Sequence, residues 1–142
     1  MKPRVKTQGR KKSKELGAVA VEFALILPIF LALILGVVEF GRAFSIQVSM
    51  AEGAREAARY MAIHYATEAD AEATARDRAM FAANPIAGLQ PGDVAITACE
   101  PGLDTVVTIT ADTAYLTGLP TLLPFLPDIM NISARGVMRC GG

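Results

Sequence analysis

The chain has 142 residues, of which 52% are hydrophobic and 6% aromatic, and its 14 basic residues balance its 14 acidic ones. It contains one histidine and two cysteines, with no glycine-rich phosphate loop and no cluster at metal-ligand spacing. This composition argues against an enzyme, and we expect neither a metal, a cofactor nor a small-molecule substrate.

The chain begins with a basic head, so its balanced total charge hides a strong asymmetry between the two parts of the sequence. Residues 1–17 hold seven lysine and arginine residues against Glu15 alone, a net charge of +6, so the remainder carries −6. All lysines lie in this head. By the positive-inside rule, the head stays cytoplasmic and the chain beyond the next segment is exported. A nucleic-acid-binding tail is the competing explanation, but a basic tail beside a membrane span more often sets topology, so we expect no nucleic acid partner.

The segment from Ala18 to Val38 is apolar except for Glu22. Its 21 residues would form a helix of roughly 31 Å, which matches a hydrocarbon core of about 30 Å. We therefore expect a transmembrane helix over residues 18–41. An ionised glutamate in lipid costs about 2.5–3.5 kcal/mol, so Glu22 either reaches the interface near the end of the span or has a specific partner.

The junction of head and span carries a recognisable motif. A basic leader ends at Gly17, and Glu22 is the fifth residue of the apolar helix that follows, as in the leaders of type IV prepilins and pseudopilins. The string Gly-Ala-Val-Ala-Val-Glu-Phe-Ala-Leu-Ile-Leu-Pro, continued by Gly-Val-Val-Glu-Phe-Gly-Arg, resembles the TadE-like family. These proteins are pseudopilins of the tight-adherence (Flp) pilus.

The resemblance implies cleavage by a prepilin-type peptidase after Gly17, with Ala18 as the new N-terminus and Glu22 as the acidic residue that processing and assembly require. It implies a minor pseudopilin that helps to assemble the pilus through helix packing, with other pilins, pseudopilins and pilus assembly proteins as partners. It also implies a single-pass protein of the bacterial inner membrane, with a cytoplasmic N-terminus and a periplasmic C-terminal domain, that is associated with the pilus.

The alternative is an uncleaved, single-pass, membrane-anchored binding or adhesin-like protein. An ordinary secretory signal fits less well, because its apolar region would be roughly 7–15 residues long. If the chain is a pseudopilin, cleavage has a physical purpose. It creates an α-amine at Ala18, which Glu22 of a neighbouring parallel helix can neutralise in low dielectric.

Small residues recur at every fourth position of the span, with a proline in the same register. The set is Ala20, Ala24, Pro28, Ala32 and Gly36. Aligned at i, i+4, they form a groove in which another membrane helix can approach closely. Pro28 removes one backbone hydrogen bond and is expected to kink the helix.

The helix should continue from residue 42 to residue 66, because no turn signal interrupts it. One side carries small and apolar residues and the other carries Glu52, Arg55, Glu56 and Arg59, which predicts an amphipathic helix with two i, i+3 ion pairs. The apolar side can pack on the chain's own sheet, on a partner helix, or on both. A second helix is predicted over 68–83, ended by Asn84-Pro85.

Three strands are expected after the helices, over residues 93–98, 105–111 and 129–139. The fold class is therefore α+β: a long transmembrane helix that continues into the periplasm, a second helix and a small antiparallel sheet. The expected organisation is a basic cytoplasmic leader at 1–17, the span at 18–41 and one periplasmic domain at 42–142.

Two further features belong to the exported part. The stretch from Leu116 to Pro127 is apolar but too short and proline-broken to cross a membrane, so it is a contact patch or a cover over the core. Cys99 and Cys140 reach an oxidising compartment, where a disulfide is the expected outcome and two unpaired thiols are the alternative.

Overall fold

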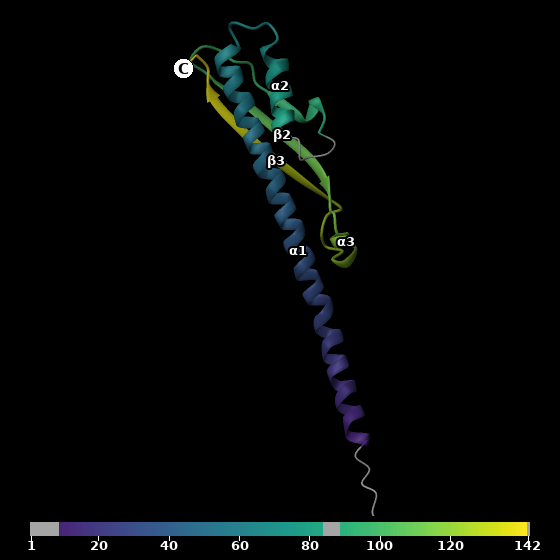
Figure 1. The fold of residues 1–142 in the computed structure, drawn as a ribbon. Helices are drawn as coiled ribbons and strands as arrows, with labels where there is room; N and C mark the ends of the chain where they lie inside the picture. Colours follow the sequence, from purple (N-terminus) through teal and green to yellow (C-terminus); the bar gives the residue numbers. More distant parts are fainter. Residues whose placement is uncertain (1–8, 84–88, 142) are drawn as a thin grey trace, which may run out of the picture. The chain divides into compact units, whose positions relative to one another are not determined.

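The computed structural model of the protein describes residues 9–83 and 89–141 (Figure 1), and it describes side chains from residue 16 onward. The first eight residues of the basic leader and the predicted helix-ending Asn84-Pro85 lie outside the described residues. The chain divides into two compact units, residues 1–37 and residues 38–142.

The first unit is built on helix α1 (Gly9–His64), which contributes to both units. Its side chains are exposed throughout from Leu16 to Leu31, although most of them are Leu, Ile, Val, Phe or Ala. Within the described residues, α1 is the one helix long and apolar enough to cross a membrane. The long N-terminal helix expected from the sequence is thus confirmed, and α1 continues through Pro28 without ending there.

The second unit combines the rest of α1 with the helices and the sheet that follow. In chain order these elements are α2 (Ala71–Ala82), η1 (Pro91–Asp93), β1 (Val94–Ile96), β2 (Asp104–Ala114), α3 (Leu119–Leu122) and β3 (Ile129–Arg139). The three strands form one antiparallel sheet in the order β1-β2-β3. The predicted α+β class is confirmed.

The sheet is dominated by one long hairpin-like pair. All 11 residues of β2 pair with β3, from Asp104 opposite Arg139 to Ala114 opposite Ile129, whereas β1 adds only three residues along β2. Buried and more exposed positions alternate along β2, so that Val107, Ile109 and Ala111 are buried on one face. β2 is longer than the predicted strand at both ends, and β1 is shorter than the predicted 93–98 segment, since η1 takes Asp93.

The apolar side of α1 packs within its own domain, which resolves the alternative left open by the sequence. Four of its residues predicted on one side are buried, namely Met50, Ala54, Ala57 and Met61. They form one core with the alanines of α2 and with Val107 and Ile109 of the sheet. The core is therefore made largely of small side chains, so the helices and the sheet approach closely.

Two glycines permit this close approach. A Cβ at Gly53 would stand 2.6 Å from the carbonyl oxygen of Ala79 in α2. A Cβ at Gly136 of β3 would overlap the backbone carbonyl of Ala54 in α1. A side chain at either position therefore cannot be accommodated without moving backbone.

The polar side of α1 differs from the sequence prediction. The expected i, i+3 pairs of Glu52 with Arg55 and of Glu56 with Arg59 are not formed. Glu56 instead pairs across to Arg78 of α2, with 3.2 Å between Oε1 and Nη1, and the Arg55 Nε donates to the carbonyl of Ala51 at 3.0 Å. A partner on a packed neighbouring helix is available in the fold and is invisible in the sequence.

The start of α2 also differs from the prediction. α2 begins at Ala71, three residues after the expected Glu68. Residues 65–70 reverse the chain instead, with the N–H groups of Thr67 and Glu68 both donating to the carbonyl of His64 at 3.0 Å. Those donors are used to end α1, so they are not free to start the next helix.

Candidate functional site

The residues predicted for processing lie on the exposed part of α1 in the first unit. Gly17, Ala18 and Glu22 are all exposed, and nothing lies within 4 Å of the position that a Cβ at Gly17 would occupy. Ala18 and Glu22 are four residues apart, so their side chains share one face of the helix. Within the described part of the chain, Glu22 has no hydrogen-bond or ion-pair partner.

The predicted packing row begins on another face of the same helix. Ala20 and Ala24 are exposed, while Ala32 and Gly36 are half-buried, and an added Cβ at Gly36 would meet nothing within 4 Å. Residues two apart on an α-helix point about 200° away from each other. Glu22 therefore lies on the opposite side from Ala20 and Ala24. Each step of four residues adds about 40°, so the row winds round the helix and Gly36 lies about 40° from the direction of Glu22.

A second polar feature ties the start of the second unit together. Glu39 is 3% exposed, and its Oε1 accepts hydrogen bonds from the backbone N–H of Thr117 at 2.6 Å and from the Thr117 hydroxyl at 3.0 Å. One turn later, the Arg42 Nη1 donates to the carbonyl of Ala114 at 3.0 Å. Two side chains of α1 thus hold the segment that leaves β2. We call this pair of contacts the Glu39–Arg42 clamp.

The clamp was missed at the level of the sequence because Glu39 and Thr117 are 78 residues apart. The sequence did contain one signal. Glu39 directly follows the apolar run, and Arg42 comes three positions later. The Glu39 Oε2 is buried and has no hydrogen-bond partner among the described residues. A buried carboxylate oxygen without a hydrogen bond lowers the stability of the fold, and the two hydrogen bonds accepted by the other oxygen, Oε1, offset this cost.

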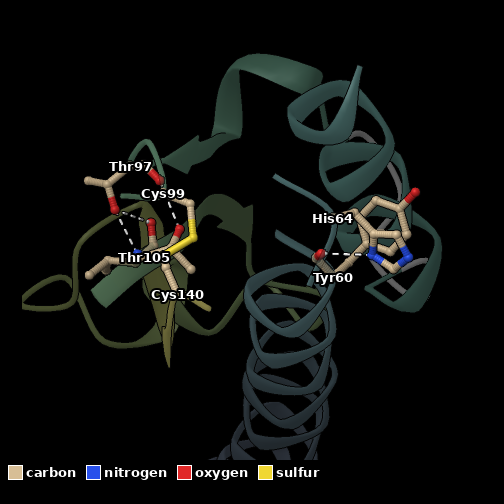
Figure 2. Close-up of a disulfide and its surroundings, with 7 residues drawn as sticks. Tyr60, His64, Thr97, Cys99, Thr105 and Cys140 are labelled. Atoms are coloured by element: carbon tan, nitrogen blue, oxygen red, sulfur yellow. Dashed lines mark hydrogen bonds between the residues drawn. A yellow bond between two sulfur atoms is a disulfide. The ribbon is translucent and has the colours of Figure 1, made fainter. Parts of the chain in front are cut away.

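The opposite end of the domain carries the disulfide (Figure 2). Cys99 and Cys140 are bonded, with 5.8 Å between their Cα atoms, and Cys140 is buried. Beside them, the buried Thr105 hydroxyl donates to the carbonyl of Thr97 at 2.8 Å. The Cys140 N–H donates to the carbonyl of Leu103 at 2.8 Å. The last residues are therefore fixed to the β1–β2 connection.

Replacing Cys99 with alanine should lower the thermal stability of the domain strongly. The bridge closes a loop of about 42 residues, which by the chain-entropy estimate is worth roughly 4 kcal/mol, or on the order of 15 °C in Tm. Thermal unfolding followed by circular dichroism measures this change. The double variant that also carries Cys140→Ala should differ little from Cys99→Ala, because the bond is already lost. A wild-type Tm in Cys99→Ala would show that packing alone holds the C-terminus.

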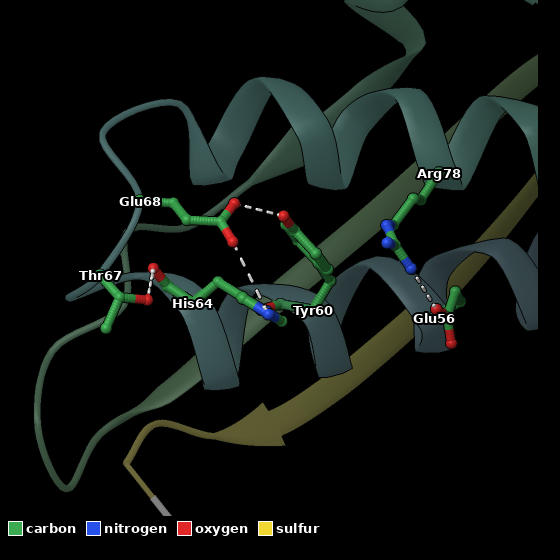
Figure 3. Close-up of polar contacts among 6 residues, drawn as sticks. All are labelled: Glu56, Tyr60, His64, Thr67, Glu68 and Arg78. Carbon is green, nitrogen blue, oxygen red and sulfur yellow. Dashed lines mark hydrogen bonds and ion pairs between the residues drawn. The ribbon is translucent and has the colours of Figure 1, made fainter.

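A polar cluster covers the junction of α1 and α2 (Figure 3). The Tyr60 hydroxyl donates to Glu68, the Tyr60 ring stacks on His64 with 4.1 Å between centroids, and Arg78 Cζ lies 4.3 Å from the centroid of the Tyr60 ring. The hydrogen bond to Glu68 raises the pKa of Tyr60, with burial and the negative charge of Glu68 acting in the same direction. His64 is half-buried in this cluster.

The cluster has the character of a structural support. His64 is held by the Tyr60 carbonyl at 3.0 Å and lies 3.8 Å from the Glu68 carboxylate, so the groups satisfy one another. Across the side chains of residues 16–83 and 89–141, no group of three or more His, Cys, Asp or Glu residues could hold a metal ion, and we assign no metal site there.

The described molecule is thus an α+β protein with a long, apolar and exposed N-terminal helix. Residues 17–59 match the family model described as TadE-like protein, which confirms the family resemblance over this segment. The match includes the residues predicted for processing, the predicted packing row and the Glu39–Arg42 clamp on its α1 side. It indicates involvement in a tight-adherence (Tad) pilus system. No curated protein and no solved structure matches the chain significantly.

Proposed function

We propose that the protein is a minor pseudopilin of a tight-adherence (Flp) pilus. It inserts in the inner membrane, a prepilin-type peptidase removes its leader after Gly17, and it joins other pilins or pseudopilins through its apolar helix. The observation that carries this proposal is the placement of Gly17, Ala18 and Glu22 on an exposed helix within the segment that matches the TadE-like family.

The proposed organisation follows the charge and the hydropathy of the chain. Residues 1–17 are the cytoplasmic leader, 18–41 are the span, and 42–142 are the periplasmic domain. The removal of the leader takes away a net charge of +6. This loss releases the N-terminal end of the helix from its cytoplasmic anchor, so that the mature chain can move from the membrane into an assembly.

Assembly uses the two faces of the span in different ways. On one face, Glu22 accepts the α-amine that cleavage creates on a neighbouring Ala18, and the pair forms because either charge alone is costly in a low-dielectric environment. The row of small residues begins on the opposite face at Ala20 and Ala24 and winds round the helix to Gly36, and it lets a second helix approach closely. The exposed, unpartnered state of Glu22 in the single chain supports a role that is fulfilled between chains.

The proposal predicts that Glu22→Gln leaves membrane insertion intact and impairs assembly. The variant keeps the shape of the side chain and removes the charge, so the α-amine of a neighbour loses its counter-ion. Losing one partner of a buried pair costs about 3–5 kcal/mol, which corresponds to a drop in incorporation on the order of a hundredfold or more. The amount of the chain that co-purifies with sheared pilus material measures it.

Glu52→Gln is the matched control, because Glu52 is an exposed acid on the same helix with no partner in the described residues. It should assemble like the wild type. Arg42 would be a poor control, since its side chain bonds to Ala114. If Glu22→Gln is processed, co-purifies with pilus components and supports piliation at the wild-type level, the pairing role of Glu22 is wrong.

A further inference from the structure

The connection between β2 and β3 is unusually apolar for a domain surface. Residues 115–127 contain no charged side chain, and Leu116, Leu122 and Phe125 are exposed, with Phe125 exposed to 79%. Leu119 is buried and fixes α3 to the domain. Large apolar side chains that a structured segment holds in the open mark a contact surface.

The connection is held at one level of the molecule. Figure 1 shows α3 beyond the end of β2, at the opposite end of the sheet from the C-terminus. Through the Glu39–Arg42 clamp, Thr117 and Ala114 are bonded to the first turn of α1 in the second unit. Glu39 is the residue directly after Val38, which ends the apolar run.

This level coincides with the membrane interface expected from the length of the span. At about 1.5 Å per residue, Arg42 stands roughly 6 Å beyond Val38 along the helix. The polar layer on each side of the hydrocarbon core is about 5–7 Å thick. Residues bonded to Glu39 and Arg42 therefore lie within or beside that layer when the span is inserted.

The helix presents aromatic rings at the same level. Phe40 and Phe44 are both exposed, and their ring centroids are 6.4 Å apart. Aromatic and aliphatic side chains that have no cover from protein are stabilised at the boundary between headgroups and acyl chains. Phe40 and Phe44 of α1 and the connection thus both present exposed apolar side chains at the level of the clamp.

We infer that the 115–128 connection rests on the periplasmic surface of the bilayer, with Leu116, Leu122 and Phe125 inserted into its interfacial layer. The clamp holds the connection in place, so the domain contacts the membrane at two points, the helix and the loop. This double contact fixes the orientation of the domain before assembly, and extraction from the membrane must release both. The inference rests on the membrane insertion contained in the proposed function.

Single tryptophans test the inference, because the chain has none. Phe125→Trp places the reporter in the connection. Phe81→Trp is the matched control, since Phe81 is also 79% exposed. Phe81 lies two residues after Ala79, which packs on Gly53, and Gly53 is about 21 Å beyond Glu39 along α1. Phe30→Trp reports on the span itself.

Each full-length variant is reconstituted into vesicles of phosphatidylcholine, with and without brominated acyl chains. Phe125→Trp should show blue-shifted emission and several-fold stronger quenching by the brominated lipid than Phe81→Trp. Acrylamide in the water phase should quench Phe81→Trp several-fold more strongly than Phe125→Trp. The brominated lipid should quench Phe30→Trp whether or not the connection contacts the membrane, because residue 30 lies in the span.

The three reporters separate the possible failures. Quenching at position 30 together with equal, water-like behaviour at positions 125 and 81 overturns the lipid contact and leaves the anchor intact. Absence of lipid quenching at position 30 overturns the anchor and the inference together. A blue shift at position 125 without lipid quenching means that protein covers the connection, in another copy or a partner, and also overturns the inference.

Discussion

Gly136→Ala should prevent the domain of residues 38–142 from folding stably. The new methyl group would overlap the backbone carbonyl of Ala54 and crowd the backbone nitrogen of Arg55. Both are main-chain atoms of α1, so no side-chain rotation can relieve the contact. Overpacking costs about 1–3 kcal/mol where neighbours can adjust, and we expect at least about 3 kcal/mol here. That is a large part of a typical stability of about 5–15 kcal/mol.

Urea unfolding of the detergent-solubilised chain, followed by circular dichroism, measures this loss. Gly92→Ala is the matched control, because nothing lies within 4 Å of the added methyl group and Gly92 does not have a positive φ. The control should be neutral or slightly stabilising, since alanine restricts the unfolded chain. Equal midpoints for the two variants would mean that α1 and β3 are not packed as closely as the structure has them.

The elements of the fold could be predicted from local patterns. The span follows from a 21-residue segment, apolar except for Glu22, between a basic head and Glu39, and β3 follows from its β-branched and apolar content over residues 129–139. Signals of this kind depend on neighbours in the sequence. They locate helices and strands well and define their ends less well, as α2 and β1 show.

The contacts that shape the domain could not be predicted in the same way. Gly136 reads as an ordinary glycine in a strand, and only the passage of Ala54 across it shows why no side chain fits. Glu56 had a plausible partner one turn away and pairs with Arg78 instead. The clamp joins residues 78 positions apart. Each depends on how elements pack, which one sequence does not state.

The candidate site shows the same division. Gly17, Ala18 and Glu22 were predicted from a linear motif, through its resemblance to the leaders of prepilins and of the TadE-like family. The structure adds that their segment is exposed and that Glu22 lies on the opposite side of α1 from Ala20 and Ala24. It also adds the clamp and the apolar connection that the clamp holds, to which no linear motif pointed.

Substitution of Gly17 should have an all-or-none effect on processing. A peptidase at the membrane face needs an extended, unhindered backbone, and glycine in the helix lowers the cost of opening it by about 1 kcal/mol relative to alanine. Gly17→Val adds a β-branched side chain at the cleavage point, so the variant should keep its leader. Gly9→Val is the matched control within the leader and should be processed normally, because it lies eight residues before the bond.

The measurement that tests the pseudopilin proposal most directly is the intact mass of the chain purified from cells with an active pilus system and its peptidase. The proposal predicts a chain that begins at Ala18 and lacks 17 residues. Because all five lysines lie before Gly17, the mature chain should also carry a single reactive amine. Finding only the full-length chain, with all its lysines, would contradict processing and identify the protein as a permanent anchor.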